Sequence, residues 1–277
     1  MEARSTVFLL LAAALAVALA APAALAHDAP GIENTLDADI SAASVAAVAV
    51  AGVLAAIGVV ISLAKTQKGP VTSTLLFLLI MVPVVLATGY LVVSTVYLNA
   101  VSATGGPVHW HTDFEIWNCG QEVDLVDPTG LENRVGSPVL HEHGDNRIHV
   151  EGVVVDLQDV NLHAFIETVG GFEEPGKLTV PTNDGPAFLQ DGDLCNGAPG
   201  TLQGFVYRVT NPDDTRRSGF LVEQVKLDDL GGYVLSPHGN IPPGDCLIIE
   251  LDQEKPRTDR ICETYRLALE RGQVTML

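Results

Sequence analysis

Basic residues are scarce in this sequence: 15 Lys and Arg stand against 34 Asp and Glu, a net charge of −19 at pH 7. The imbalance is concentrated beyond the first hundred residues, since positions 99–277 hold 12 basic and 29 acidic residues, a net of −17. A surface of this charge repels nucleic-acid phosphates and anionic lipid headgroups. The composition therefore argues against nucleic acid as a partner.

The sequence also lacks the short motifs of several common enzyme classes. It contains no G-x-S-x-G elbow, G-x-x-x-x-G-K-[ST] loop, H-E-x-x-H helix or C-x-x-C pair. These patterns supply, in turn, a serine nucleophile, a phosphate cradle, a zinc site and a redox-active dithiol. No such motif assigns the chain a reaction or a substrate, and the sequence favours a binding protein over an enzyme.

Cysteine is rare, and all four cysteines follow residue 100: Cys119, Cys195, Cys246 and Cys262. An even number of cysteines in an oxidising compartment predicts two disulfides, with three possible pairings. The alternative is that Cys119 is a metal thiolate near the histidines described below.

Apolar residues make up 47% of the chain and are concentrated in its first hundred positions. Arg4 precedes an apolar run at 7–21 and then Ala24-Leu25-Ala26, the order of features in a secretory signal peptide. We expect a signal peptide at 1–26, with an uncleaved helix as the alternative, and a short exported segment at 27–39. His27 then becomes the mature N-terminus, where its amine and imidazole can together chelate Cu²⁺.

Two further apolar runs, at about 40–64 and 71–98, each exceed the roughly 20 residues that cross a bilayer. We expect them to form a two-helix membrane anchor at 40–98. Lys65 and Lys68 are the only basic residues between Arg4 and Arg134, which places the loop between the two helices in the cytoplasm. The sequence thus predicts a cell-membrane protein with an extracytoplasmic domain at 99–277.

The expected fold class is α+β, with a β-rich extracytoplasmic domain that contains one or two helices. Runs rich in β-branched and aromatic residues predict strands at 110–118, 147–155, 177–181, 202–210, 219–226 and 245–251. A helix is expected from Asp156 to the Gly170-Gly171 pair, and a second at 258–271. The Gly- and Pro-containing stretch at 182–200 is expected to be a loop.

Five of the eight histidines fall within the 41 positions from 109 to 149, where even scattering would place about one. They are His109, His111, His141, His143 and His149. Alternation along a strand places apolar Trp110, Phe114 and Ile116 on one face. The other face carries His109, His111, Asp113 and Glu115. In the strand at 147–155, His149 and Glu151 likewise point away from the core.

If these strands are neighbours, several imidazoles converge on one polar surface. Neutral imidazole nitrogens suit Zn²⁺, Cu²⁺ or Ni²⁺, so we expect the five histidines to form a copper or zinc site. Asp113, Glu142 and Asp145 can act as extra ligands or orient the imidazoles. The expected function is metal handling or sensing, with the metal ion and the lipid bilayer as partners; the sequence identifies no protein partner.

The histidine motifs resemble those of a group of largely uncharacterised, exported, His-rich archaeal and bacterial domains. That group has an H-x-H strand followed by an L-H-x-H-x4-I-H-[IV]-E strand, which correspond here to 109–111 and 140–151. The resemblance covers roughly 107–165 and, more loosely, extends to about 251. It implies that the five histidines act together, and it implies no activity.

Two other functions remain open. A cupin-like metalloenzyme is the first, because His109-x-His111-x-x-x-Glu115 is similar to the first cupin metal motif. The second cupin motif is poorly matched, since Pro242 occupies the position of its metal-binding histidine. The other alternative is an exported interaction domain whose histidines are ordinary surface residues.

Overall fold

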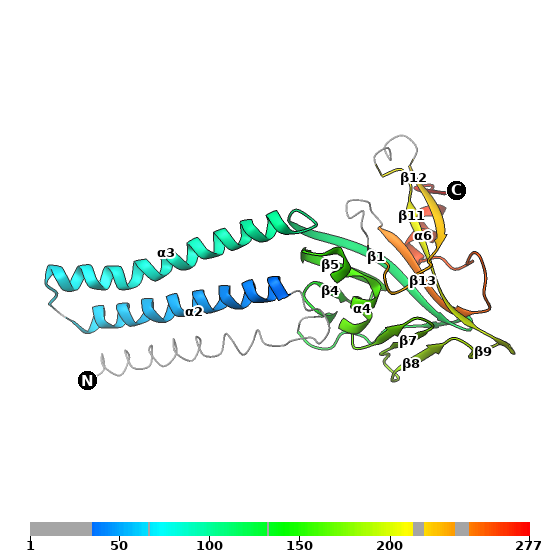
Figure 1. The fold of residues 1–277 in the computed structure, drawn as a ribbon, viewed down its shortest axis with the longest axis horizontal. Coiled ribbons are helices and arrows are strands. Elements are labelled where there is room, and N and C mark those ends of the chain that lie inside the picture. The colour runs from blue at the N-terminus through cyan, green and yellow to red at the C-terminus, as the bar shows by residue number, and fades with distance from the viewer. Residues whose placement is uncertain (1–34, 66, 132, 213–218, 236–243) are drawn as a thin grey trace. The chain divides into compact units, whose positions relative to one another are not determined.

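The computed structural model describes residues 35–65, 67–131, 133–212, 219–235 and 244–277, which form two compact units. The helical unit contains α2 (Thr35–Ala64) and α3 (Pro70–Val101), and the sheet unit contains the β-rich part of the chain from Ser102 onward (Figure 1). The expected α+β content is therefore confirmed. The predicted signal peptide, His27 and His238 lie outside the described residues.

Both helices of the helical unit are long and apolar enough to cross a membrane. Helix α2 begins at Thr35, so positions 35–39 of the segment that we expect to be exported are helical. The helices approach each other closely at Gly58, where an added Cβ would lie 2.6 Å from Ile80 Cγ1. A side chain at position 58 would force Ile80 of the neighbouring helix to shift, so glycine permits this close approach.

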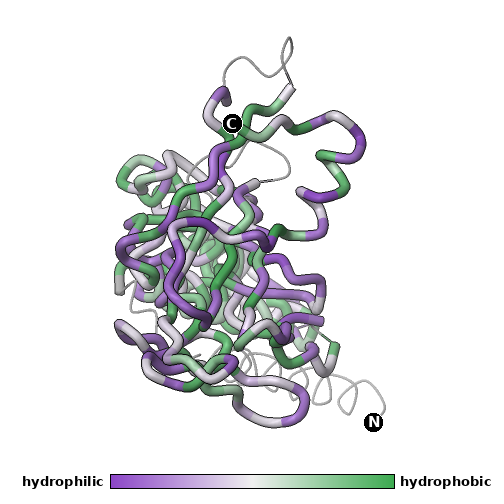
Figure 2. Tube along the Cα trace, turned by 90° about the vertical axis from the view of Figure 1, so that its right-hand side faces the viewer, coloured by the Kyte–Doolittle hydropathy of each residue, from purple (hydrophilic) through white to green (hydrophobic). Residues whose placement is uncertain are grey.

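A nine-stranded mixed sheet organises the sheet unit, with the strand order β14-β12-β11-β13-β1-β5-β4-β3 and β2 paired to β1. Its strands are β1 (Pro107–Asn118), β2 (Gln121–Val123), β3 (Val135–Gly136), β4 (Leu140–Glu142), β5 (Arg147–Val153), β11 (Thr201–Val209), β12 (Phe220–Lys226), β13 (Asp245–Asp252) and β14 (Val274–Met276). Strand β1 is parallel to β13 and antiparallel to β5. Figure 2 shows that the sheet unit contains both hydrophobic and hydrophilic residues along its trace.

One face of the sheet, the core face, packs against a helix. The predicted apolar side of β1 is buried there, and Phe114 meets Phe165 of α4 (Leu162–Thr168) edge to face at 5.8 Å between ring centroids. The helix expected from Asp156 is broken into the 3-10 turn η1 (Leu157–Val160) and α4. The break occurs at Asn161, which is extended and whose side chain caps α4 by accepting from the Ala164 amide.

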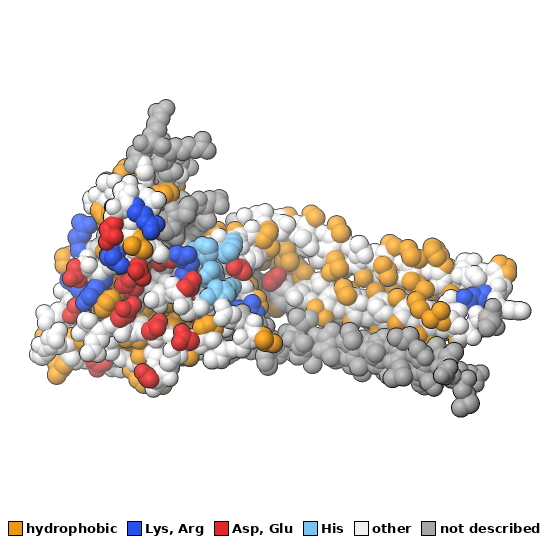
Figure 3. Space-filling model, turned by 180° about the vertical axis from the view of Figure 1, so that it is seen from behind, with side chains coloured by type: hydrophobic (Ala, Val, Ile, Leu, Met, Phe, Trp, Pro, Cys, Tyr) orange, Lys and Arg blue, Asp and Glu red, His pale blue; other side chains and the backbone are white. Residues whose placement is uncertain are grey.

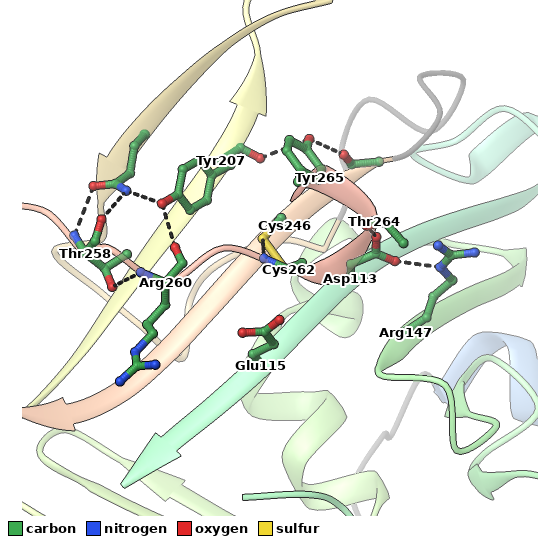
Figure 4. Close-up of a disulfide and its surroundings, with 12 residues drawn as sticks. Asp113, Glu115, Arg147, Tyr207, Cys246, Thr258, Arg260, Cys262, Thr264 and Tyr265 are labelled. Atoms are coloured by element: carbon green, nitrogen blue, oxygen red, sulfur yellow. Dashed lines mark hydrogen bonds and ion pairs between the residues drawn. A yellow bond between two sulfur atoms is a disulfide. The ribbon is translucent and has the colours of Figure 1, made fainter. Parts of the chain in front are cut away.

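The other face is covered over β13 by α6 (Glu263–Glu270), whose buried Tyr265 and Ala268 contact the sheet core (Figure 4). This helix is shorter than the 258–271 predicted. Thr258 is instead held to β12, because its amide donates to Gln224 Oε1 and its carbonyl accepts from Gln224 Nε2. A residue fixed in this way cannot join a helix.

Positions 182–200, expected to be a loop, contain short strands. They are β8 (Ala187–Gln190), β9 (Leu194–Cys195) and β10 (Ala198–Pro199); β8 joins a three-stranded sheet with β6 (Phe172–Glu174) and β7 (Lys177–Val180). Leu189 of β8 is fully buried against the core, which explains why this polar segment is ordered as a strand.

Disulfides join Cys119 to Cys195 and Cys246 to Cys262, confirming the two bridges.

Candidate metal centre

Three adjacent strands bring the five histidines together on the sheet face opposite the core face. In the antiparallel register, His111 of β1 lies opposite His149 of β5, and His149 lies opposite His141 of β4. His109 precedes His111 on the same face, and His143 directly follows β4. The side chains form one continuous patch beside acidic and basic residues (Figure 3).

The cluster consists of two groups of three that share one residue. The first group is His109, His111 and His149; the second is His141, His143 and His149. Within each group, one potential ligand atom per residue lies within 4.8 Å of the others. Two nitrogens on one ion at 2.0–2.1 Å are at most about 4.2 Å apart, so small side-chain rotations suffice for either group to bind an ion.

His149 is the centre of the cluster. Its ring stacks on that of His141 with centroids 5.3 Å apart and meets the rings of His111 and His143 nearly at right angles, at 4.6 and 4.8 Å. The residue is 9% exposed, and neither buried ring nitrogen has a hydrogen-bond partner among the described residues. Burial, reinforced by the neighbouring His111, lowers the pKa of His149 to about 4. The ring is thus neutral at neutral pH, the state in which imidazole binds a metal.

Backbone carbonyls orient both histidines near β4. His141 Nδ1 lies 3.1 Å from the Ser137 carbonyl oxygen, and His143 Nδ1 is hydrogen-bonded to the Asn133 carbonyl. Nδ1 therefore carries the proton in each ring, and Nε2 is left as the nitrogen with a lone pair. Burial also lowers the pKa of His141. The tight turn before β4 needs Gly136, at φ +115°, where a Cβ would lie 2.4 Å from the Leu140 carbonyl oxygen.

His109 and His111 point their Nε2 atoms at each other across 3.0 Å. This separation is close to the spacing of two nitrogens that share one ion. Burial, followed by the nearby His109, lowers the pKa of His111. A positive charge on the adjacent ring disfavours protonation of His111, so His111 favours the neutral form that binds metal.

Two carboxylates lie at the margins of the cluster. Glu151 Oε1 is 3.0 Å from His109 Nε2 and 3.9 Å from His149 Nδ1, while Asp145 Oδ2 is 3.9 Å from His149 Nε2. Asp145 is one of the acidic residues that the sequence suggests as additional ligands, whereas Glu151 is not. The sequence does carry a signal for Glu151, because it lies two residues beyond His149 and hence on the same face of the strand. The structure adds that Glu151 lies opposite His109 in the β1–β5 register.

The other acidic residues considered from the sequence serve the fold instead. Asp113 is 3% exposed, accepts from Arg147 Nε at 2.6 Å and is bonded by the Thr264 hydroxyl (Figure 4). Glu142 is turned away from the histidines, and its Oε1 accepts from the amides of Asp145 and Asn146. That contact closes the turn between β4 and β5 and so fixes the register of the second histidine group.

Two alternative ligand sets suggested by the sequence, the cupin-like motif and the Cys119 thiolate, do not form at this site. Glu115, the third residue of the cupin-like motif, accepts from the Trp117 indole at 3.0 Å and lies four positions from His111, roughly 13 Å along the strand. His149 takes its place beside the two histidines of β1. Cys119 is bonded to Cys195, so the interpretation of Cys119 as a metal thiolate is wrong.

His163, outside the cluster, is held by acidic neighbours. Its Nδ1 lies 2.9 Å from buried Glu173 and its Nε2 lies 3.4 Å from Glu167. The hydrogen bond to Glu173 raises the pKa of His163, the opposite of the shift in the cluster. Both ring nitrogens are already engaged, so His163 serves as an internal reference for a histidine that is not a ligand.

Comparisons with protein-family models, with curated proteins and with solved structures found no match to this chain. The function proposed below therefore depends on the geometry and chemistry of these residues alone.

Proposed function

We propose that this protein is a membrane-anchored, extracytoplasmic metal-binding protein that holds copper or zinc through His109, His111, His141, His143 and His149. The observation that carries the proposal is the convergence of five imidazoles on one sheet face around His149, a buried residue whose ring nitrogens lack hydrogen-bond partners among the described residues. A buried polar group without a partner is destabilising, and a metal ion would satisfy it.

The donor set favours certain metals. All four cysteines are in disulfides, so the chain offers no thiolate to a soft ion. Neutral imidazoles with marginal carboxylates suit Zn²⁺ and Cu²⁺. The disulfides fit an oxidising compartment, and the two apolar helices fit a membrane anchor, which together support a role in metal handling or sensing outside the cytoplasm.

Metal analysis of the full chain in detergent tests this proposal. The protein is stripped with a chelator, incubated with Zn²⁺ or Cu²⁺, desalted and analysed for bound metal. We expect tight binding that is lost when all five clustered histidines are replaced by alanine and retained in the control His163→Gln. Equal retention by the native chain and the five-alanine variant would instead favour the interaction-domain alternative.

A further inference from the structure

His149 differs from its neighbours in how its ring nitrogens are used. A histidine that binds one metal ion normally has its second nitrogen held by a carbonyl or carboxylate. His141 and His143 follow this rule, because backbone carbonyls hold their Nδ1 atoms. His149 does not, since both of its nitrogens are buried and lack hydrogen-bond partners in the described part of the chain.

The position of His149 explains this difference. It lies on the middle strand, with the first histidine group on β1 and the second on β4, and it is the one residue common to both. Its two nitrogens point toward different carboxylates. Nδ1 is 3.9 Å from Glu151, which also contacts His109, and Nε2 is 3.9 Å from Asp145, which lies in the turn between β4 and β5.

We propose that the cluster is a dinuclear centre in which the His149 ring bridges two metal ions. This inference rests on the proposed metal-binding function and deepens it. His109 and His111 complete one site, His141 and His143 complete the other, and Glu151 and Asp145 lie at the margins of the cluster. Each ion then has three imidazoles, which leaves one coordination position for a carboxylate or for an incoming ligand.

The proton balance of the bridge is simple. Neutral His149 carries one N–H, and the first ion binds the nitrogen that has the lone pair. The second ion displaces the remaining proton to solvent, so the bridge is an imidazolate and one proton is released for that step. No electron transfer or other reactant is required.

Copper titration of the full chain in detergent tests the bridge directly. All proteins carry His27→Ala, so that an N-terminal amine and imidazole add no copper site. We expect two Cu²⁺ per chain. An imidazolate couples two Cu²⁺ spins antiferromagnetically, so the low-temperature electron paramagnetic resonance signal should grow to one equivalent and fall at two.

Single variants separate the two sites. His111→Ala and His143→Ala should each bind one Cu²⁺ and give a full, uncoupled signal, whereas the control His163→Gln should retain two coupled ions. His149→Gln, which preserves a polar side chain, should abolish the coupling and weaken binding of both ions. A normal circular dichroism spectrum and melting transition show that a variant is folded.

The outcomes distinguish the bridge from the proposed function. One ion per native chain, or two ions with the full signal of uncoupled copper, would overturn the bridge while leaving the metal-binding function intact. No copper bound by the native chain would overturn both. Two ions with a diminished signal that His149→Gln restores to the uncoupled intensity per bound copper would support both.

Discussion

His111 and His149 are direct cross-strand partners in the β1–β5 register, and their ring centroids lie 4.6 Å apart. Protonation of either ring is unfavourable in this pair, because burial removes solvent from the charge and a second positive ring would repel it. The pKa of each residue is lowered accordingly, mainly by burial. The sheet thus keeps both rings in the neutral form that binds metal.

Replacing one histidine in each group should abolish tight metal binding. In the double variant His111→Ala/His143→Ala, both groups retain at most two imidazoles. Loss of a residue that merely orients a ligand weakens metal affinity 10–100-fold, so we expect loss of one ligand from each group to weaken it by at least about 100-fold. Both side chains are only half-buried, and the apolar face of the sheet is untouched, so the melting temperature without metal should change little. Isothermal titration with Zn²⁺ and a thermal melt measure both quantities; unchanged affinity would contradict the proposed ligands.

Acid should destabilise the metal-free protein through His149. Its folded-state pKa is about 4 against about 6.5 in the unfolded chain, so between these values the unfolded state binds more protons. The free energy of unfolding therefore falls as the pH drops through this window, by about 2 kcal/mol from His149 between pH 7 and 5.

Urea unfolding at pH 7 and pH 5, compared with His149→Gln, isolates this effect. The comparison is needed because burial raises the pKa of Glu115 and Glu142, which changes stability in the opposite sense. The variant should lose less stability at pH 5 than the native chain does. An identical pH dependence in both proteins would show that His149 is not held neutral.

Asp113 should be essential for stability although it is not a metal ligand. It is buried, and it links the histidine strand β1 to Arg147 on β5 and to Thr264 on α6. Asp113→Ala leaves Arg147 without its partner, and breaking a buried pair in this way costs about 3 kcal/mol or more. The exposed ion pairs of Arg266 with Glu263 and Glu270 provide the control, since Arg266→Ala should cost less than about 1 kcal/mol. Equal losses in the two variants, measured by urea unfolding, would contradict this assignment.

The sequence predicted the histidine strand well, because alternation along β1 depends only on local geometry. It could not predict that His111 and His141 would both lie opposite His149, since strand order and register depend on long-range pairing. The carbonyl groups that hold His141 and His143 could not be predicted from the sequence either. Ser137 lies in the turn between β3 and β4, whose shape depends on Gly136 and on its close approach to Leu140, and Asn133 lies before β3.

In the helices too, the local sequence pattern determines where an element forms, whereas distant contacts determine where it begins and ends. The apolar pattern correctly located α6, but its start depends on contacts between Thr258 and Gln224, 34 positions away. Likewise, Asn161 interrupts the predicted helix because its backbone forms a bridge with Val234. Side-chain periodicity carries no information about such contacts, so boundaries shift while the elements themselves persist.

The four cysteines should be unreactive in the unreduced, denatured protein, because the chain holds two disulfides. Their loops differ greatly: Cys119–Cys195 spans a sequence separation of 76 residues and Cys246–Cys262 one of 16. On chain-entropy grounds, removal of the first should destabilise by about 4–5 kcal/mol and of the second by about 3 kcal/mol. Thiol labelling and urea unfolding of the paired Cys→Ser variants measure these effects. Two or more reactive thiols in the unreduced native chain would contradict the pairing.

Membrane orientation is the last prediction. If α2 and α3 both cross the membrane, Lys65 and Lys68 lie between them, and short loops rich in lysine remain in the cytoplasm. The sheet unit is then outside, where disulfides form and where a metal site meets extracytoplasmic ions. Protease added to intact cells should remove the sheet unit, while a cysteine introduced as Gln67→Cys should be labelled by a thiol reagent only after the cells are permeabilised.

Substitution of the two lysines tests whether they determine the orientation of the chain in the membrane. Replacing Lys65 and Lys68 with glutamine removes the basic residues that favour a cytoplasmic loop, so a fraction of the chains should insert in the opposite orientation. In that fraction the sheet unit is cytoplasmic, protected from protease and deprived of its disulfides by the reducing environment. Protection of the sheet unit in cells that express the native chain would contradict the orientation and would place the histidine cluster on the cytoplasmic side.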